Sequence, residues 1–367
     1  MSVPVSPDAL SAALNTVLDD LTGQPYLGGK PPRQLKVTDA GAVSFELPLG
    51  YPAQSLHAGI RQRLDAAART VPGVTSTDVR IVTQIIPHQV QRGVPLLAGV
   101  ANVVAVSSGK GGVGKSTTAV NLALALASEG ARVGVLDADI YGPSVPTMTG
   151  LAGQRPQSED GKTMDPLRNH GLQVMSIGFL VEPDQAVVWR GPMATQALDQ
   201  LLRQTRWDAL DYLLIDMPPG TGDIALTLSQ RVPLTGAIIV TTPQDIALLD
   251  AKKGLNMFEK VGVPILGIVE NMAVYCCPNC GHAEHIFGAD GGKSMAAQYG
   301  VPYLGALPLQ RAIREQTDAG TPTVVAAPDS EAAGLYRDVA RRMAVGLAAQ
   351  AKDFSAKFPT ISISAST

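Results

Sequence analysis

The sequence predicts an α/β fold in which a mostly parallel sheet forms a large domain and a small α+β domain precedes it. Three observations support this fold class. Short continuous apolar runs alternate with segments of helical spacing after residue 101, as in parallel strands covered on both faces. The first run leads into a glycine-rich loop and an Ala/Leu-rich helix. Before residue 87, strand-like alternation stands beside helical segments, and 367 residues exceed the usual single domain.

The small α+β domain is predicted for residues 1–86. Residues 8–21 and 55–70 have helical spacing. Residues 34–49 and 75–86 alternate like strands. A turn is expected at Asp39-Ala40-Gly41. Residues 87–101, PHQVQRGVPLLAGVA, contain two prolines and two glycines without sustained periodicity, which is typical of a linker.

The large domain is predicted for residues 102–350. Seven apolar runs are its expected strands: NVVAVSS, RVGVLDAD, LQVMSIG, YLLIDMP, GAIIVTT, ILGIVENM and YLGALP. Residues 331–349 have the spacing of a packed terminal helix. Residues 351–367 form a polar tail whose function the sequence does not reveal. Ligands of such sheets bind beyond the carboxyl ends of the strands, so the loops there are the place to seek chemistry.

Composition excludes several classes of function. The net charge of -3 gives no bulk attraction to nucleic acid or anionic lipid. The N-terminus has no secretory signal, and no run of about 18 apolar residues occurs. We therefore expect a cytoplasmic protein that binds neither nucleic acid nor membrane. In reducing cytosol, the three cysteines are better explained as metal ligands than as disulfides.

The glycine-rich loop reads GKGGVGKS and fits the pattern GxxxxGK[ST] between a strand and a helix. Glycines allow backbone N–H groups to wrap phosphates, a lysine reaches the β- and γ-phosphates, and a serine ligates magnesium. The expected nucleotide-binding residues are Gly109, Lys110, Gly111, Gly112, Val113, Gly114, Lys115, Ser116 and Thr117. One lysine suffices for the bound phosphates, so Lys110 needs a separate explanation.

Carboxylates stand at the ends of two predicted strands. Asp216 ends YLLID, where a residue that organises magnesium belongs, and Asp137 and Asp139 end GVLDAD. A buried strand rarely ends in two carboxylates unless a cation or a polar ligand lies there, although either residue could instead cap a helix. We expect Asp139 and Asp216 to serve the nucleotide.

All three cysteines fall within five residues, in YCCPNC. Cys277 and Cys280 form a CxxC knuckle that can direct two thiolates at one metal centre. His282 and His285 follow too closely for a zinc finger of the usual spacing. Two knuckles at a two-fold axis would supply four thiolates, for a [4Fe-4S] cluster or for a bridging zinc ion. Cys276 points to the opposite face of an extended segment and is not an expected ligand.

Several motifs in order resemble one family. The loop GKGGVGKS with DADIYGPS and DMPPGTGD is similar to the deviant Walker A class, which includes MinD, ParA and the nitrogenase iron protein. Within that class, WRGPM at 189–193, ENM at 270–272 and CPNCG at 277–281 resemble the Mrp/ApbC family of iron–sulfur cluster carriers. The resemblance covers residues 100–345. The N-terminal domain resembles, more by pattern than by fixed residues, a domain shared with iron–sulfur assembly factors.

The resemblance implies roles for single residues. Lys110 would reach the phosphates bound by the other chain of a nucleotide-sandwich dimer, where charge develops in the transition state; the alternative is a solvated lysine. Asp139 would position the attacking water, and Asp216 with Ser116 would organise Mg²⁺. Asn271 would contact the adenine, although an asparagine at a strand end is often a turn former.

The resemblance also implies the function. The chain would be a homodimeric carrier that binds ATP and Mg²⁺, hydrolyses ATP slowly, and holds a cluster on thiolates shared between two chains. It would pass the cluster to apoproteins and meet other iron–sulfur assembly proteins. The alternative is a spatial organiser of the MinD or ParA kind with a zinc-bridged dimer. An electron-transfer ATPase is less favoured because the cysteines occupy one segment only.

Overall fold

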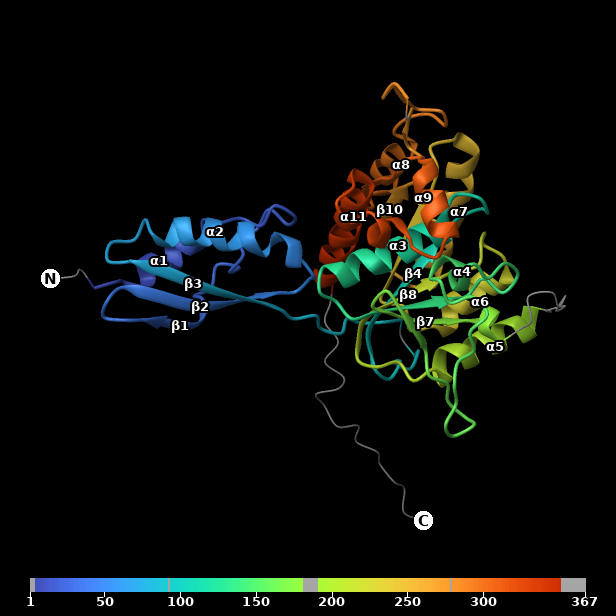
Figure 1. The fold of residues 1–367 in the computed structure, drawn as a ribbon, viewed down its shortest axis with the longest axis horizontal. Helices are drawn as coiled ribbons and strands as arrows, with labels where there is room; N and C mark the ends of the chain where they lie inside the picture. The colour runs from blue at the N-terminus through green and yellow to red at the C-terminus, as the bar shows by residue number, and fades with distance from the viewer. Residues whose placement is uncertain (1–3, 92, 181–190, 278, 351–367) are drawn as a thin grey trace, which may run out of the picture.

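The computed structural model describes residues 4–91, 93–180, 191–277 and 279–350. The predicted tail, residues 351–367, and the first two residues of WRGPM lie outside the described residues. Two domains stand side by side, with the N-terminal one in blue and the larger one in green to red (Figure 1). The predicted fold class, a mostly parallel sheet behind a small α+β domain, is confirmed.

The N-terminal domain packs two helices on a three-stranded sheet. Its strands are β1 (Arg33–Val37), β2 (Ala42–Leu49) and β3 (Ser76–Thr83), in the order β1-β2-β3, with β1 antiparallel and β3 parallel to β2. Its helices are α1 (Pro7–Leu14) and α2 (His57–Ala68), with a short 3₁₀ turn at Gln54–Leu56. Alternate residues of β2 are buried, which is the pattern of a sheet with one face on a core.

The first helix is shorter than its spacing predicts. Helical periodicity extends to residue 21, but α1 ends at Leu14. Asn15 is the physical reason: its side-chain amide donates to the carbonyl of Ser11 at 2.8 Å and accepts a hydrogen bond from the N–H of Gly29 at 2.9 Å. Such local side-chain bonds favour a turn over continued helix. The chain then folds back and forms a bridge between Leu18 and Pro25.

The larger domain is built on an eight-stranded sheet in the order β13-β10-β9-β4-β8-β5-β7-β6. Its strands are β4 (Val100–Ser107), β5 (Val133–Asp137), β6 (Leu167–Asn169), β7 (Leu172–Ser176), β8 (Leu210–Asp216), β9 (Gly236–Thr241), β10 (Ile265–Glu270) and β13 (Tyr303–Ala306). All neighbours are parallel except β6, which pairs antiparallel with β7. The seven predicted apolar runs are the seven parallel strands.

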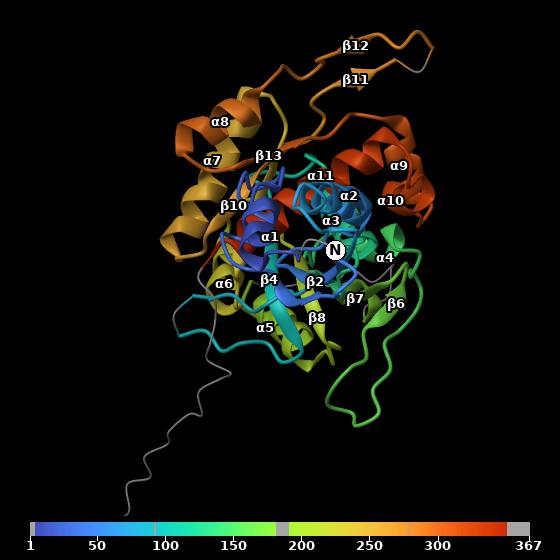
Figure 2. The same cartoon turned by 90° about the vertical axis from the view of Figure 1, so that its left-hand side faces the viewer.

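Helices cover both faces of this sheet (Figures 1 and 2). They are α3 (Lys115–Ser128), α4 (Val145–Met148), α5 (Gly191–Gln204), α6 (Asp223–Arg231), α7 (Asp245–Lys260), α8 (Gly291–Tyr299), α9 (Arg311–Asp318), α10 (Thr323–Ala326) and α11 (Glu331–Ala348). In the sheet, β5 lies on one side of β4 and β9 on the other. The chain runs from β4 to β5 first, and later crosses from β8 over β4 to β9. Right-handed crossovers in opposite directions place their helices on opposite faces, and the reversal beside β4 creates the crevice where ligands bind.

A short hairpin escapes the sequence prediction. Strands β11 (Tyr275–Cys276) and β12 (Ala283–Glu284) pair antiparallel and carry the cysteine segment away from the body of the domain (Figure 2). Two-residue strands are too short to give a periodic signal. The edge strand β6 is only three residues long and was missed for the same reason.

The two domains meet at the carboxyl end of α3. Glu129, which follows α3 and is fully buried, accepts hydrogen bonds from the backbone N–H of Ser55 at 2.9 Å and from its hydroxyl at 2.6 Å. Arg341 of α11 pairs with the same carboxylate at 2.8 Å. The predicted linker is also held, because His88 is buried and contacts Asn102. The linker therefore does not separate two independent bodies.

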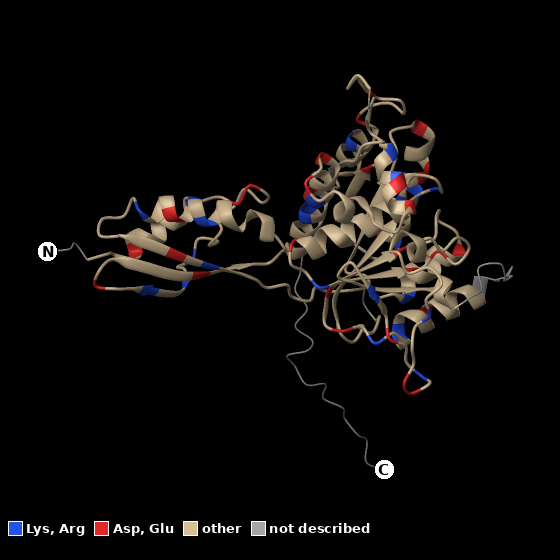
Figure 3. Ribbon diagram, viewed as in Figure 1, with Lys and Arg blue, Asp and Glu red and all other residues tan. Residues whose placement is uncertain are grey.

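Charged residues of both signs are interspersed over the two domains (Figure 3). Among the described residues, no helix combines the length and the apolar character needed to cross a bilayer.

Candidate nucleotide site and cysteine hairpin

The phosphate loop joins β4 to α3 at the point where the sheet reverses. Gly112 and Gly114 have φ values of 80° and 79°, a left-handed conformation that favours glycine. The loop surrounds a cavity of about 220 Å³. That cavity is lined by Ser108, Lys110, Gly111, Gly112, Gly114, Lys115, Ser116, Thr117, Asp139, Ser144, Met148 and Pro219. Most of the predicted nucleotide-binding residues thus surround one space.

Lys115 is engaged within the protein. Its ammonium group lies 2.5 Å from Asp216 Oδ1 and donates to Ser116 Oγ at 3.2 Å. Both members of the ion pair are buried, with side-chain exposures of 6% and 0%. Lys115 lines the cavity, so its positive charge faces the space that a phosphate would enter. A bound phosphate would compete with Asp216 for this lysine.

A second carboxylate lies beside Asp216. Asp137 is its neighbour in register on the adjacent strand, and it accepts hydrogen bonds from the N–H groups of Asp139 and Val145 and from Ser176 Oγ, at 3.1 to 3.2 Å. Burial, and then the charge of Asp216, raise the pKa of Asp137 to about 8. Asp137 therefore takes up a proton far more readily than an ordinary aspartate. Burial also raises the pKa of Asp139, at the edge of the cavity.

These carboxylates suit a magnesium ion. Asp216 Oδ2 is buried and has no hydrogen-bond partner within the part of the chain that the structure describes. Such an unsatisfied oxygen is costly unless a cation or a donor arrives. Ser116 and Asp137 place further oxygen atoms nearby, and Mg²⁺ prefers oxygen ligands. The residues present therefore fit the ion.

Sequence reasoning had placed Asp137 at a strand end but had not chosen it as a site residue. The available signal was its position at the carboxyl end of a buried strand next to Asp216, but their adjacency depends on strand order. Ser176, which bonds to Asp137 from the end of β7, gave no comparable signal.

Asn271 lies directly after β10 and touches the phosphate loop. Its side-chain Nδ2 donates to the carbonyl oxygen of Val113 at 2.8 Å, and the side chain is buried. A Cβ atom on Gly114 would lie 2.2 Å from the same Nδ2, so only glycine fits there. The predicted contact with adenine stays a prediction.

The cysteine hairpin presents free thiols at its tip. Cys276 and Cys280 are exposed and Cys277 is partly exposed. The N–H of Cys277 donates to the carbonyl of His282, and the N–H of Gly281 donates to the carbonyl of Cys277, both at 2.9 Å. These bonds close a tight knuckle and bring the two ends of the CxxC motif together.

The knuckle also favours the thiolate form of Cys277. Backbone N–H groups of Asn279 and Cys280, followed by the thiol of Cys280, lower the pKa of Cys277. The ring of His285 is committed elsewhere, because its Nδ1 donates to the carbonyl of Ala273 at 2.7 Å. Within the ranges described above, no group of three or more His, Cys, Asp and Glu side chains is arranged to hold a metal ion.

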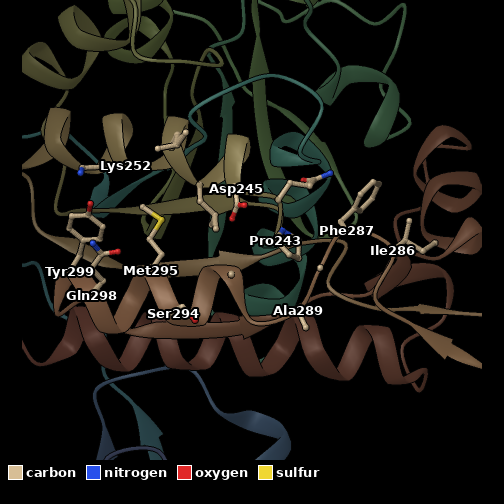
Figure 4. A pocket seen from close by; sticks show the side chains of 15 residues that line it. Pro243, Asp245, Lys252, Ile286, Phe287, Ala289, Ser294, Met295, Gln298 and Tyr299 are labelled. Carbon is tan, nitrogen blue, oxygen red and sulfur yellow. The ribbon is translucent and has the colours of Figure 1, made fainter.

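A larger cavity of about 890 Å³ lies between α7 and α8, next to the segment that follows the hairpin (Figure 4). Apolar side chains form much of its wall, among them Leu248, Ile286 and Phe287, and Lys252 lies 5.6 Å from the ring centroid of Tyr299. The glycine-rich sequence GKGGVGKS does not line it. The smaller cavity at the phosphate loop is therefore the better nucleotide site, despite its size.

The fold and the smaller cavity define the class of protein. In the larger domain, β4 leads through the loop GKGGVGKS into α3, and β4 belongs to a mostly parallel sheet. This arrangement is typical of a P-loop NTPase. Comparison with solved structures agrees. A nucleotide-binding protein from Archaeoglobus fulgidus in complex with ADP matches with a TM-score of 0.56 and 36% identity, over 64% of this chain and 90% of that one. The cell division ATPase MinD of Pyrococcus furiosus matches with a TM-score of 0.50 and 25% identity, over 66% and 98%.

Sequence comparison identifies the family. Residues 99–344 match the model of the NUBPL iron-transfer P-loop NTPases, and residues 7–81 match that of an iron–sulfur cluster assembly protein. The iron–sulfur cluster carrier protein of Escherichia coli strain K12 is 54% identical over 305 residues, 83% of each chain. The chain belongs to this family of iron–sulfur cluster carrier P-loop NTPases, and the predicted resemblance is confirmed.

Proposed function

We propose that the protein binds and slowly hydrolyses ATP, holds an iron–sulfur cluster on Cys277 and Cys280 shared between two copies of the chain, and delivers it to apoproteins. One observation carries this proposal: the segment that leads from β10 into the hairpin with its free CxxC thiols contacts the phosphate loop through Asn271. The base of the segment that carries the thiols is therefore in direct contact with the loop that would bind the nucleotide.

The nucleotide part of the proposal follows from the charges. Lys115, paired with Asp216 in this structure, would hold the β- and γ-phosphates, and Asp216 with Ser116 and Asp137 would hold Mg²⁺. When bound, Mg²⁺ neutralises part of the phosphate charge. Asp139, at the cavity edge, orients the attacking water. Lys110 lines the cavity and supplies a cation to the phosphates of the other copy.

The cluster part rests on the thiols. Two thiolates are half of the four that a [4Fe-4S] cluster takes, and a second copy related by a two-fold axis supplies the other two. Backbone N–H groups already favour the thiolate of Cys277. We place this work in the cytoplasm, where thiols stay reduced, because all three cysteines are free.

Proposed partners are apoproteins that accept the cluster and other proteins of iron–sulfur assembly. The relative in Escherichia coli is named a cluster carrier, and residues 7–81 match an assembly-protein family. The N-terminal domain contains no cysteine, so we propose docking rather than cluster binding for it.

The test is anaerobic reconstitution with iron and sulfide, followed by iron, sulfide and zinc analysis and by measurement of mass in solution. The protein is compared with Cys277→Ala and Cys280→Ala, and with Cys276→Ala as the matched control. We expect about one cluster per dimer, lost in the first two variants and kept in the control. Transfer to an apo-ferredoxin then tests delivery.

Two outcomes would overturn the proposal. A cluster that survives both Cys277→Ala and Cys280→Ala would mean that other ligands hold it. Stoichiometric zinc without iron uptake would leave a zinc-bridged dimeric ATPase and would favour the organiser.

A further inference from the structure

The segment that carries the cysteines leaves the sheet directly beside the phosphate loop. Residues 272–290 form an excursion between the end of β10 and the start of α8, and the hairpin is its outer part (Figure 2). Asn271 stands at its entrance. This buried side chain, 7% exposed, donates through Nδ2 to the carbonyl of Val113 in the phosphate loop. The two residues are 158 positions apart in the sequence.

The entrance of the excursion is held by a series of hydrogen bonds. The N–H of Asn271 donates to Thr241 on β9 at 2.7 Å, and the next residue, Met272, has a φ of 57°. A side-chain residue in this left-handed region is strained and persists only where its surroundings fix it. The N–H of Ala273 then donates to Leu307 at 3.0 Å, so the chain direction toward the hairpin is set.

The exit of the excursion is tied to the same point. The carboxylate of Glu270, 2% exposed, accepts a hydrogen bond from the N–H of Gly292 at the start of α8. His285, after the hairpin, bonds back to Ala273 before it. The excursion is therefore closed at its base, and a shift of that base would carry Cys277 with it.

We propose that Asn271 is a positioning residue that joins the phosphate loop to the cysteine hairpin, so that occupation of the loop by phosphate changes the exposure of Cys277 and Cys280. This inference rests on the proposed function. It differs from the predicted adenine contact, because the link runs through the carbonyl of Val113 and needs no base.

The physical reason is that Asn271 bonds directly to the phosphate loop. Phosphate binding recruits the N–H groups of the loop and draws Lys115 from Asp216, which moves the loop backbone. Asn271 Nδ2 bonds directly to the carbonyl of Val113 at 2.8 Å, so a shift of the loop acts on the amide. A buried amide without a hydrogen-bond partner is unfavourable, so the side chain follows the loop.

The experiment measures alkylation of Cys277 and Cys280 by iodoacetamide in the cluster-free full chain, resolved by mass spectrometry. Rates are compared without ligand, with Mg²⁺-ADP and with Mg²⁺-pyrophosphate, which has no base. Each ligand is used at saturation, as determined by calorimetry for each variant. Asn271→Ala is compared with Gln173→Ala, which removes another buried amide, 5% exposed, donating to the carbonyl of Asp208 at 2.9 Å.

We expect both ligands to change the rates in the wild type and in Gln173→Ala by about fivefold or more. In Asn271→Ala the alkylation rates of Cys277 and Cys280 should be the same with and without either ligand. If the alanine variant binds neither ligand, Asn271→Ser, with a short donor of its own, is measured in its place. Wild-type thiols that ignore both ligands would overturn the inference, as would an Asn271 variant that keeps the response.

A response to ADP but not to pyrophosphate would also overturn it, because the signal would then pass through the base. These outcomes are separate from the proposed function. Cluster binding by the wild type without a thiol response would leave the carrier proposal standing and remove only the role of Asn271.

Discussion

Asp137 is a carboxyl group whose location works against its own ionisation. It is fully buried and lies beside Asp216, and its pKa rises to about 8. Protonation of one carboxyl group removes the repulsion between two buried acids when no divalent cation is bound between them. Lys115 neutralises the second acid in the meantime.

This arrangement predicts a pH dependence of stability. Between the ordinary value of 3.8 and about 8, the folded nucleotide-free protein holds a proton on Asp137 that the unfolded chain lacks. The free energy of unfolding should therefore fall as pH rises through this window, by at most about 1.4 kcal/mol per pH unit for one proton. The raised pKa values of Asp139 and Glu270 act in the same direction. Urea unfolding at pH 6 and pH 8.5 measures the fall.

Asp137→Asn is the matched variant for this effect, because its amide cannot titrate. Its unfolding free energy should change less between the two pH values than that of the wild type. An equal change in both proteins would show that Asp137 ionises normally.

Lys115 has a structural role as well as its expected catalytic one. Lys115→Ala should abolish ADP binding in calorimetry. It should also lower the free energy of unfolding by about 3–5 kcal/mol, because Asp216 then stands buried without a partner. Adding Asp216→Asn should restore much of the stability and none of the binding. A single variant as stable as the wild type would contradict the role of the buried ion pair.

At the scale of elements, the phosphate loop is packed against a helix far away in the sequence. A Cβ atom on Gly109 would lie 2.0 Å from the carbonyl carbon of Asp250 in α7, whereas a Cβ atom on Gly111 would meet nothing within 4 Å. The two glycines of one loop thus serve different purposes. Gly109 permits close packing, and Gly111 leaves the backbone open to a ligand.

Gly109→Ala should therefore cost about 1–3 kcal/mol of stability, since the helix or the loop must move. Gly111→Ala should stay within about 0.5 kcal/mol of the wild type. Thermal unfolding of the two variants, side by side, is the measurement. Equal losses in both would mean that the loop adapts and that α7 does not restrict it.

At the scale of the whole molecule, α3 spans from the phosphate loop to the other domain. Its first residue is Lys115, and Glu129 directly after it holds Ser55 of the N-terminal domain. Arg341 completes the joint from α11. One rigid helix therefore touches both the phosphate site and the domain that we propose for docking.

Glu129→Ala should lower the free energy of unfolding by about 1–3 kcal/mol, because Ser55 loses its acceptor and the nearly buried Arg341 keeps only its ion pair with Asp338. Asp318→Ala breaks an exposed ion pair with Arg314 and should cost less than about 1 kcal/mol. Limited proteolysis of the segment between the domains should be faster in the first variant only. Equal proteolysis rates in both would show that other contacts hold the domains together.

Much of the fold could be predicted because its signals are local. The seven parallel strands are buried on both faces, so each is a continuous apolar run, and GKGGVGKS encodes its own turn. Elements with weak local signals were not found, namely β6 and the β11–β12 hairpin. The predicted first helix is too long because Asn15 ends α1 through its bond with Gly29, which the spacing does not reveal.

The sequence by itself determined the class, the phosphate loop and the pair of thiols, since each depends on residues that are neighbours in the chain. The tertiary structure decided what those parts touch. Strand order sets Asp137 beside Asp216. The end of β10 lies near the phosphate loop, so Asn271, which follows it, contacts Val113. Contacts between residues more than 70 positions apart arise from the packing of the sheet, which no local pattern in the sequence can encode.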